Sequence, residues 1–203
     1  MKGNAYTLFY AAVLGSVCAL LLTAAASFTA PYKKANAEAE EALNILLALK
    51  VPLAAEASAA DVLKVLEASV REKDRGGVTM YTYSPPDAGG KTLAVAMRFS
   101  GPGVWAPIRG FLALEPDMRT IRGITFYEQE ETPGLGGEIV TSWFREQFVG
   151  KSIMGPDGKP GIIVSKPGEQ AANKVDAISG ATMTCDKVQA MLNEAIKSIV
   201  EEK

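Results

Sequence analysis

Two stretches of the chain combine residue types that could hold a ligand, and the first lies near the C-terminus. It contains Asp176, Ser179, Gly180, Ala181 and Thr182. Gly180 allows a tight turn, and Thr182 would stand where the next helix begins, close to unpaired amides and the positive end of the helix dipole. The N-terminus of a helix is a favourable binding site for a phosphate group. The simpler alternative is that the Thr182 hydroxyl only caps the helix.

The helix itself is predicted over residues 183–200, because apolar residues recur there at the spacing of one helical face. These residues are Val188, Met191, Leu192, Ala195, Ile196 and Ile199.

The second stretch is rich in glycine and covers residues 131–138. Thr132, Gly134, Leu135 and Gly136 make a backbone that can approach a flat ligand closely and that offers amides and one apolar side chain. No Gly-Lys-Ser/Thr follows, so the stretch is not a phosphate-binding P-loop, and its spacing does not fit the dinucleotide-binding fingerprint. The alternative is a glycine-rich loop of no special purpose.

Composition restricts the chemistry that the chain could perform. Its 203 residues carry a formal net charge of −2 and contain no histidine, which excludes His-based triads and His-ligated metal or haem. Cys18 and Cys185 lack metal-ligand spacing and are not placed to form a disulfide, so no metal site is expected. No basic patch suited to nucleic acid is present. Such a chain either binds something or lets a cofactor do the chemistry.

The N-terminal segment predicts a membrane anchor. Residues 3–32 carry no charge, and a helix over residues 6–30 would span a hydrocarbon layer of about 30 Å. A cleaved signal peptide, with its site near Ala24 to Ala26, is the alternative, but the apolar run exceeds the roughly 7–15 residues usual for one. An uncleaved anchor is therefore favoured. The orientation of the anchor stays open, because the positive charges at its two ends are nearly balanced. Lys2 lies at one end, and Lys33 and Lys34 lie at the other.

The rest of the chain predicts an α+β fold with a mainly antiparallel sheet and flanking helices. A helix is expected over residues 33–50, ended by Pro52, and a second helix opened by a capping box at Ser58 and Asp61 and stopped by Gly76 and Gly77. Strands are expected at 78–83, 92–99, 109–114 and 120–127, with a further hairpin joining 152–153 to 162–164 and a short helix over 141–149. We accordingly divide the chain into an anchor (1–32), a helical connector (33–75) and a ligand-binding domain (76–203).

Taken together, the two stretches resemble the paired signatures of the FMN-binding domain family. Residues 176–182, an Asp followed after two residues by Ser-Gly-Ala-Thr, resemble the family's flavinylation motif. Residues 131–136, Glu-Thr-Pro-Gly-Leu-Gly, resemble its other signature, and the two motifs follow each other in the same order as in the family. Segments 101–105, 110–114 and 123–127 look like the NqrC subunit of the sodium-translocating NADH:quinone reductase, and next like the RnfG subunit of the related Rnf complex. The chain departs from that pattern in its compactness and in Gln129 and Glu130, where His-Gly would be expected.

The resemblance implies roles for individual residues. It implies that Thr182 carries FMN through a phosphoester made by a dedicated flavin transferase, within a motif that includes Ser179, Gly180 and Ala181. The amides of Met183 and Thr184 would stabilise the phosphate, and the Thr184 hydroxyl is a further candidate. Asp176, which would repel a phosphate, is assigned to recognition by the transferase or to holding the turn. Candidates for contact with the flavin ring are Leu135 and the backbone of Thr132, Gly134 and Gly136. Trp105 either stacks nearby or is a buried structural residue, and Met183 could equally belong to the core. No residue is expected to act as an acid or base.

The resemblance further implies an electron-transfer subunit of an Nqr- or Rnf-type ion-translocating oxidoreductase, anchored in the cytoplasmic membrane by a single span. Its partners would be other subunits of that complex, the flavin transferase and the lipid bilayer. The soluble domain would lie on the extracytoplasmic, periplasmic side of the membrane. One alternative is a free-standing extracytoplasmic electron carrier with covalent FMN that feeds a terminal reductase. Another is an anchored binding module in which Thr182 is merely a helix cap.

Overall fold

The computed structural model of the protein describes residues 2–54, 56–75, 78–168 and 170–201. The chain divides into two compact units, Met1–Ala39 and Glu40–Lys203, which are described separately. The boundaries predicted at residues 32 and 75 stay predictions.

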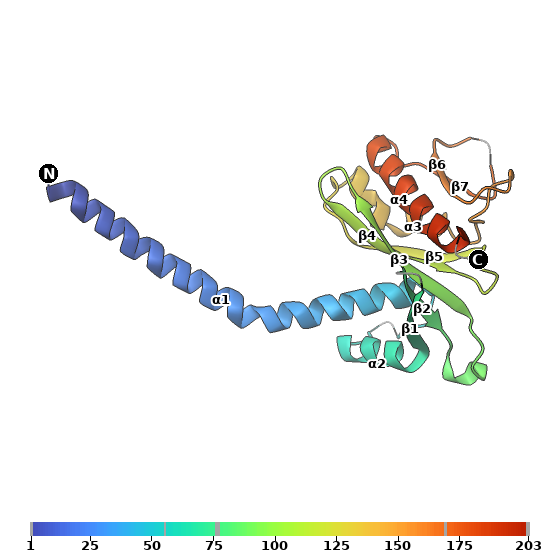
Figure 1. Ribbon diagram of the computed structural model, residues 1–203, viewed down its shortest axis with the longest axis horizontal. Helices are drawn as coiled ribbons and strands as arrows, with labels where there is room; N and C mark the ends of the chain where they lie inside the picture. The colour runs from blue at the N-terminus through green and yellow to red at the C-terminus, as the bar shows by residue number, and fades with distance from the viewer. Residues whose placement is uncertain (1, 55, 76–77, 169, 202–203) are drawn as a thin grey trace. The chain divides into compact units, whose positions relative to one another are not determined.

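The first unit is part of helix α1 (Lys2–Ala48), drawn in blue in Figure 1. An 18-residue window of this helix has a mean hydropathy of 2.1, and none of that window is buried. By length and composition the helix could cross a membrane, which agrees with the predicted anchor. The separate helix expected from residue 33 is instead a continuation of α1, which contains Pro31 and ends four residues before Pro52.

The second unit is built on a five-stranded antiparallel sheet in the order β1-β2-β3-β4-β5. Its strands are β1 (Val70–Arg75), β2 (Val78–Tyr83), β3 (Ala94–Pro102), β4 (Pro107–Leu114) and β5 (Ile121–Glu128). A short 3-10 helix, η1 (Pro86–Ala88), lies between β2 and β3. The four strands predicted from residues 78 to 127 are confirmed, with shifts of a few residues at their ends. The fold is therefore α+β with a mainly antiparallel sheet, as predicted.

Helix α2 (Ala59–Ser69) begins as the sequence predicts and ends earlier. The Ser58 hydroxyl accepts a hydrogen bond from the Asp61 amide, and the Asp61 carboxylate accepts one from the Ser58 amide, so the capping box is present. The prediction that this helix continues to Gly76 and Gly77, which themselves lie outside the described residues, is wrong. Residues of β1 pair along their whole length with β2, and this pairing outweighs local helix propensity.

The C-terminal part adds short elements and one long helix. They are η2 (Gly136–Val140), α3 (Ser142–Glu146), β6 (Ile163–Ser165), β7 (Lys174–Asp176) and α4 (Thr182–Glu201). A short helix forms in the segment predicted over 141–149, but α3 covers only Ser142–Glu146. Helix α4 matches its predicted span within one residue at each end. The hairpin predicted between 152–153 and 162–164 is wrong in its pairing. Its turn forms, with a bridge between Met154 and Pro160, but β6 pairs in parallel with β7 and Ser152 bridges to Thr120.

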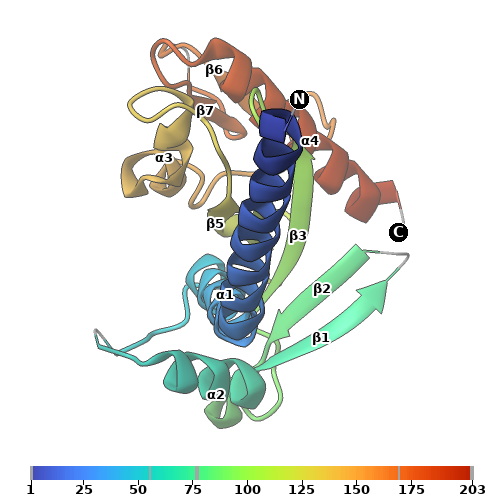
Figure 2. The same cartoon turned by 90° about the vertical axis from the view of Figure 1, so that its left-hand side faces the viewer.

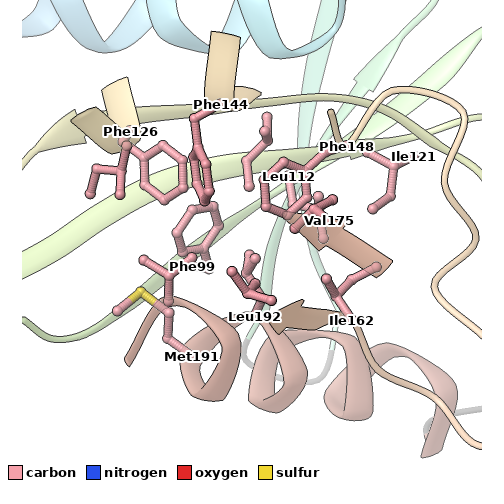
Figure 3. Close-up of a cluster of buried hydrophobic side chains, with 14 of the residues drawn as sticks. Phe99, Leu112, Ile121, Phe126, Phe144, Phe148, Ile162, Val175, Met191 and Leu192 are labelled. Atoms are coloured by element: carbon pink, nitrogen blue, oxygen red, sulfur yellow. The ribbon is translucent and has the colours of Figure 1, made fainter. Parts of the chain in front are cut away.

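Each face of the sheet carries its own core. Figures 1 and 2 show α3 and α4 on the side of the sheet opposite to α2. Residues of α2 and of the end of α1, including Val62 and Leu46, pack on one face of the sheet. On the other face, Phe99 and Phe126 lie edge to face at 5.5 Å, with Phe144 of α3 and Met191 of α4 in the same cluster (Figure 3). The buried side of α4 thus packs on this face of the sheet.

Candidate functional site

Helix α4 begins at Thr182, directly after a tight turn. Gly180 has a φ of +78°, a left-handed conformation that glycine adopts without strain. The Ala181 carbonyl accepts the first helical hydrogen bond, from the Cys185 amide at 3.0 Å. Ala181 therefore occupies the N-cap position, and Thr182 is the first residue of the helix proper.

The Thr182 side chain is exposed and makes no hydrogen bond with any described residue. The alternative in which its hydroxyl caps the helix is therefore wrong, because Ala181 holds the cap position. The first amides of a helix have no partner within it, so the hydroxyl stands beside backbone donors at the positive end of α4.

A buried cysteine holds the turn from beneath. The amide of Ile178 donates to Sγ of Cys185 at 3.4 Å, and both residues belong to the core beneath α4. Burial raises the pKa of the Cys185 thiol, so the thiol is uncharged at neutral pH. We assign this cysteine to packing rather than to reactivity.

The glycine-rich loop lies against this turn. The Thr132 carbonyl accepts hydrogen bonds from the amides of Leu135 at 3.1 Å and Gly137 at 2.9 Å, and Gly134 has a φ of +76°. A Cβ placed on Gly180 would lie 3.1 Å from Cδ2 of Leu135, so the leucine side chain contacts the turn. The two stretches singled out in the sequence therefore meet in space.

Together they form an open cavity of about 260 Å³. Nine of the twelve predicted site residues line it, namely Trp105, Thr132, Leu135, Gly136, Gly180, Ala181, Thr182, Met183 and Thr184. The described residues also line cavities of about 280 and 430 Å³, but neither of these lies at a helix N-terminus.

The other three predicted residues lie outside the lining. Ser179 is exposed on the turn. Gly134 forms the bend of the loop, where its amide donates to Oε1 of Glu138 at 3.1 Å. Asp176 ends β7, and its backbone exchanges two hydrogen bonds with the Gln147 side chain, at 2.9 and 3.4 Å.

Two of the open assignments are decided by burial. Trp105 is 73% exposed, so the alternative of a buried structural tryptophan is wrong. Met183 is 64% exposed, so it is not part of the core. With Leu135 they line one cavity, and exposed apolar side chains gathered at a cavity suit contact with a ligand.

Two residues that line the cavity, Val104 and Glu131, were not predicted as site residues. Glu131 is the charged one of the two. Its side chain is 5% exposed and accepts hydrogen bonds from the amides of Val104 at 2.7 Å and Trp105 at 3.3 Å, and from Oγ1 of Thr184 at 2.6 Å. The Thr184 hydroxyl, a candidate phosphate contact in the sequence, is instead committed to this carboxylate. An acid at the start of a glycine-rich loop was visible, but its partner 53 residues away was not.

Comparison with known proteins identifies the domain that carries this cavity. The sequence profile of the FMN-binding domain family matches residues 103–197. This segment, just under half of the chain, is therefore similar to the FMN-binding domain family. The matched segment includes both motifs, every residue that lines the cavity and most of α4.

Curated relatives resemble the same part of the chain. The NqrC subunit of the Na+-translocating NADH-quinone reductase of Neisseria meningitidis is 45% identical over 101 residues, which is 49% of this chain and 39% of that protein. The corresponding protein of Pasteurella multocida is 40% identical over 107 residues, which is 52% of this chain and 41% of that protein. The chain thus matches about two fifths of the length of these relatives.

Solved structures resemble a larger part of the chain, which extends before residue 103. The crystal structure of the NqrC subunit of the Na+-translocating NADH-quinone reductase from Parabacteroides distasonis has a TM-score of 0.70 and 25% identity, and the similarity covers 84% of this chain and 94% of that one. The Shewanella oneidensis NqrC structure has a TM-score of 0.66 at 24% identity, covers 77% of this chain and 91% of that one, and so supports the fold.

Proposed function

We propose that this protein is a membrane-anchored electron-transfer flavoprotein whose FMN is joined to Oγ of Thr182 through a phosphoester. The observation that carries the proposal is the unbonded Thr182 hydroxyl, placed at the N-terminus of α4 inside the cavity of the FMN-binding domain. A hydroxyl in this position is accessible for modification and stands beside donors suited to a phosphate.

The residues around the hydroxyl fit the group. The amides at the start of α4 suit the phosphate, while Trp105, Leu135 and Met183 offer uncovered apolar surface to an aromatic ring. At about 260 Å³ the cavity is smaller than the roughly 300–1,000 Å³ of typical ligand pockets, so it would enclose only part of an FMN. Partial enclosure leaves an edge open to an electron-transfer partner.

FMN, when bound, supplies the electron exchange, and the chain supplies attachment and orientation. The attachment to Thr182 would fix the ring against the loop that carries Leu135. No acid or base is needed for such a role, which agrees with the absence of histidine from the sequence.

We further propose that the chain works as a subunit of an Nqr-type, or related Rnf-type, ion-translocating complex in the cytoplasmic membrane, with its FMN-binding domain on the periplasmic side. The names of the relatives and the apolar helix α1 support this proposal. Extraction in mild detergent followed by a native gel tests it. Comigration with quinone-reductase or ferredoxin-oxidising partners is the expected result, whereas migration alone would favour a free-standing electron carrier.

Covalent attachment is tested by in-gel fluorescence of denatured protein, coexpressed with a flavin transferase. We expect a fluorescent band for the wild type and for Ser198→Ala, and none for Thr182→Ala. Ser198 is the matched control, because it offers a hydroxyl on the same helix but lies outside both the motif and the cavity lining. Fluorescence that survives in Thr182→Ala would contradict the proposal.

A further inference from the structure

The Glu131 carboxylate is buried beneath the cavity with donors on both oxygens. Oε1 accepts from the amides of Val104 and Trp105, and Oε2 accepts from the Thr184 hydroxyl. Carboxylate oxygens accept hydrogen bonds and donate none, so these three donors suit the carboxylate form of the side chain. Glu131 forms no ion pair with any residue in the described part of the chain, so only dipoles stabilise its charge.

Its three partners belong to two segments that are distant from it in sequence, and each of them lines the cavity. Val104 and Trp105 belong to the connection between β3 and β4, whereas Thr184 lies in the first turn of α4. Glu131 itself begins the glycine-rich loop, and its amide donates to Oε1 of Gln129 at 2.6 Å. One side chain therefore joins the three walls of the site.

The surrounding glycines leave room for this arrangement and for nothing larger. A Cβ on Gly103 would lie 2.6 Å from Oε1 of Glu131, and a Cβ on Gly136 would lie 2.8 Å from Oε2 and 2.4 Å from Oγ1 of Thr184. These separations are shorter than van der Waals contacts, so an alanine at either position would displace the carboxylate or its partner.

We propose that Glu131 is the positioning residue of the flavin site and that its charge makes the bound FMN harder to reduce. Through Thr184 it fixes the turn of helix that begins at Thr182, and through two amides it fixes the loop that presents Trp105. A negative charge that is buried and has no cation beside it opposes the arrival of an electron in the same cavity, which lowers the midpoint potential. The second half of this proposal depends on FMN attachment at Thr182.

Redox titration of the full-length, FMN-loaded chain in detergent tests the charge. We expect Glu131→Gln to raise the midpoint potential, because the amide keeps the size of the side chain and removes its charge. Glu130→Gln is the matched control, since Glu130 precedes Glu131 in the chain but is exposed and does not line the cavity, and it should leave the potential unchanged. A loaded Glu131→Gln protein with the wild-type potential would overturn the proposal.

Hydrogen exchange of the chain without FMN tests positioning independently of the cofactor. In Glu131→Asp the charge stays but the side chain is one methylene shorter and cannot reach all three donors. The Val104 and Trp105 amides should then exchange roughly ten-fold faster or more, as expected for loss of hydrogen bonds to a charged acceptor. Wild-type exchange at both amides would overturn the positioning role. If the wild type carries no FMN, the proposed function fails, while this readout still decides the role of Glu131 as a positioning residue.

Discussion

A methyl group added at Gly136 would disrupt the hydrogen bond at the centre of the site. Gly136 is buried, and a Cβ there would lie 2.4 Å from Oγ1 of Thr184 and 2.8 Å from Oε2 of Glu131. These two atoms are themselves hydrogen-bonded at 2.6 Å. The new methyl group must therefore separate them or shift the loop.

The cost of Gly136→Ala follows from three terms. Losing a hydrogen bond to a charged group costs about 1.5–3 kcal/mol, and overpacking a filled site costs about 1–3 kcal/mol. The backbone of Gly136 does not have a positive φ, so alanine restricts the unfolded chain and returns about 0.4–1 kcal/mol. The net loss in the free energy of unfolding is about 1.5–5.5 kcal/mol, or a fall in Tm of roughly 3–22 °C for a chain of this length.

Thermal unfolding followed by circular dichroism measures this loss on the full chain in detergent. Gly137→Ala is the matched control, because the nearest atoms to a Cβ there are the backbone oxygens of Thr132 and Glu131, at 3.1 and 3.2 Å. Its Tm should fall clearly less than that of Gly136→Ala. Equal melting temperatures for the two variants would refute the view that the Glu131–Thr184 contact is tightly enclosed.

Three further predictions concern the scaffold. Gly123→Ala should destabilise the domain by about 1–3 kcal/mol in chemical denaturation, because a Cβ there would lie 2.4 Å from the carbonyl oxygen of Ala48, a backbone atom that cannot move freely. An unchanged midpoint of denaturation would contradict this close packing. Ser58→Ala should cost about 1 kcal/mol in the same assay through loss of the N-cap, and Ser58→Thr, which keeps a capping hydroxyl, should cost less. Hydrogen bonds from the Thr120 hydroxyl and amide hold the pKa of Asp117 below its ordinary value of about 3.9. The Asp117 carboxylate therefore stabilises the fold above that pH, and this contribution disappears as pH falls through the lowered pKa. The difference in Tm between wild type and Asp117→Asn should therefore shrink from pH 6 to pH 3, and a difference that grows would contradict this sign.

Elements with strong local signals could be predicted from the sequence. The capping box at Ser58, the turns between the central strands and the apolar stripe of α4 each depend on residues close together in the chain, and all three were found where expected. The glycine-rich loop and the turn before Thr182 were predicted to act together because both were recognised as parts of a single family pattern, and the structure places them around one cavity.

The elements that were missed depend on distant partners. Residues Val70–Arg75 are mostly charged and lack an apolar alternation, so they continue the helical pattern in sequence, yet they form the edge strand β1. Charged residues are common on such edges, where one side of the strand has no neighbour. Similarly, β6 has only three residues, and its partner β7 begins nine residues after it ends, so the local turn chemistry at 155–159 indicated the wrong pairing.

The contact of Glu131 with Thr184 is the clearest case of information that the sequence did not show. Each residue belongs to a motif or stands beside one, but the hydrogen bond exists only because the loop and the first turn of α4 fold against each other. The sequence therefore predicted which stretches form the site, and the structure was needed to assign what each side chain does within it.

The central claim is that Thr182 carries FMN. Its most direct test is tandem mass spectrometry of proteolytic peptides from the full chain, coexpressed with a flavin transferase that is active on a control protein. The account predicts that the peptide containing Thr182 is heavier by FMN minus water and that its fragments place this mass on Thr182. An unmodified peptide, or the same mass located on Ser179, would contradict the account.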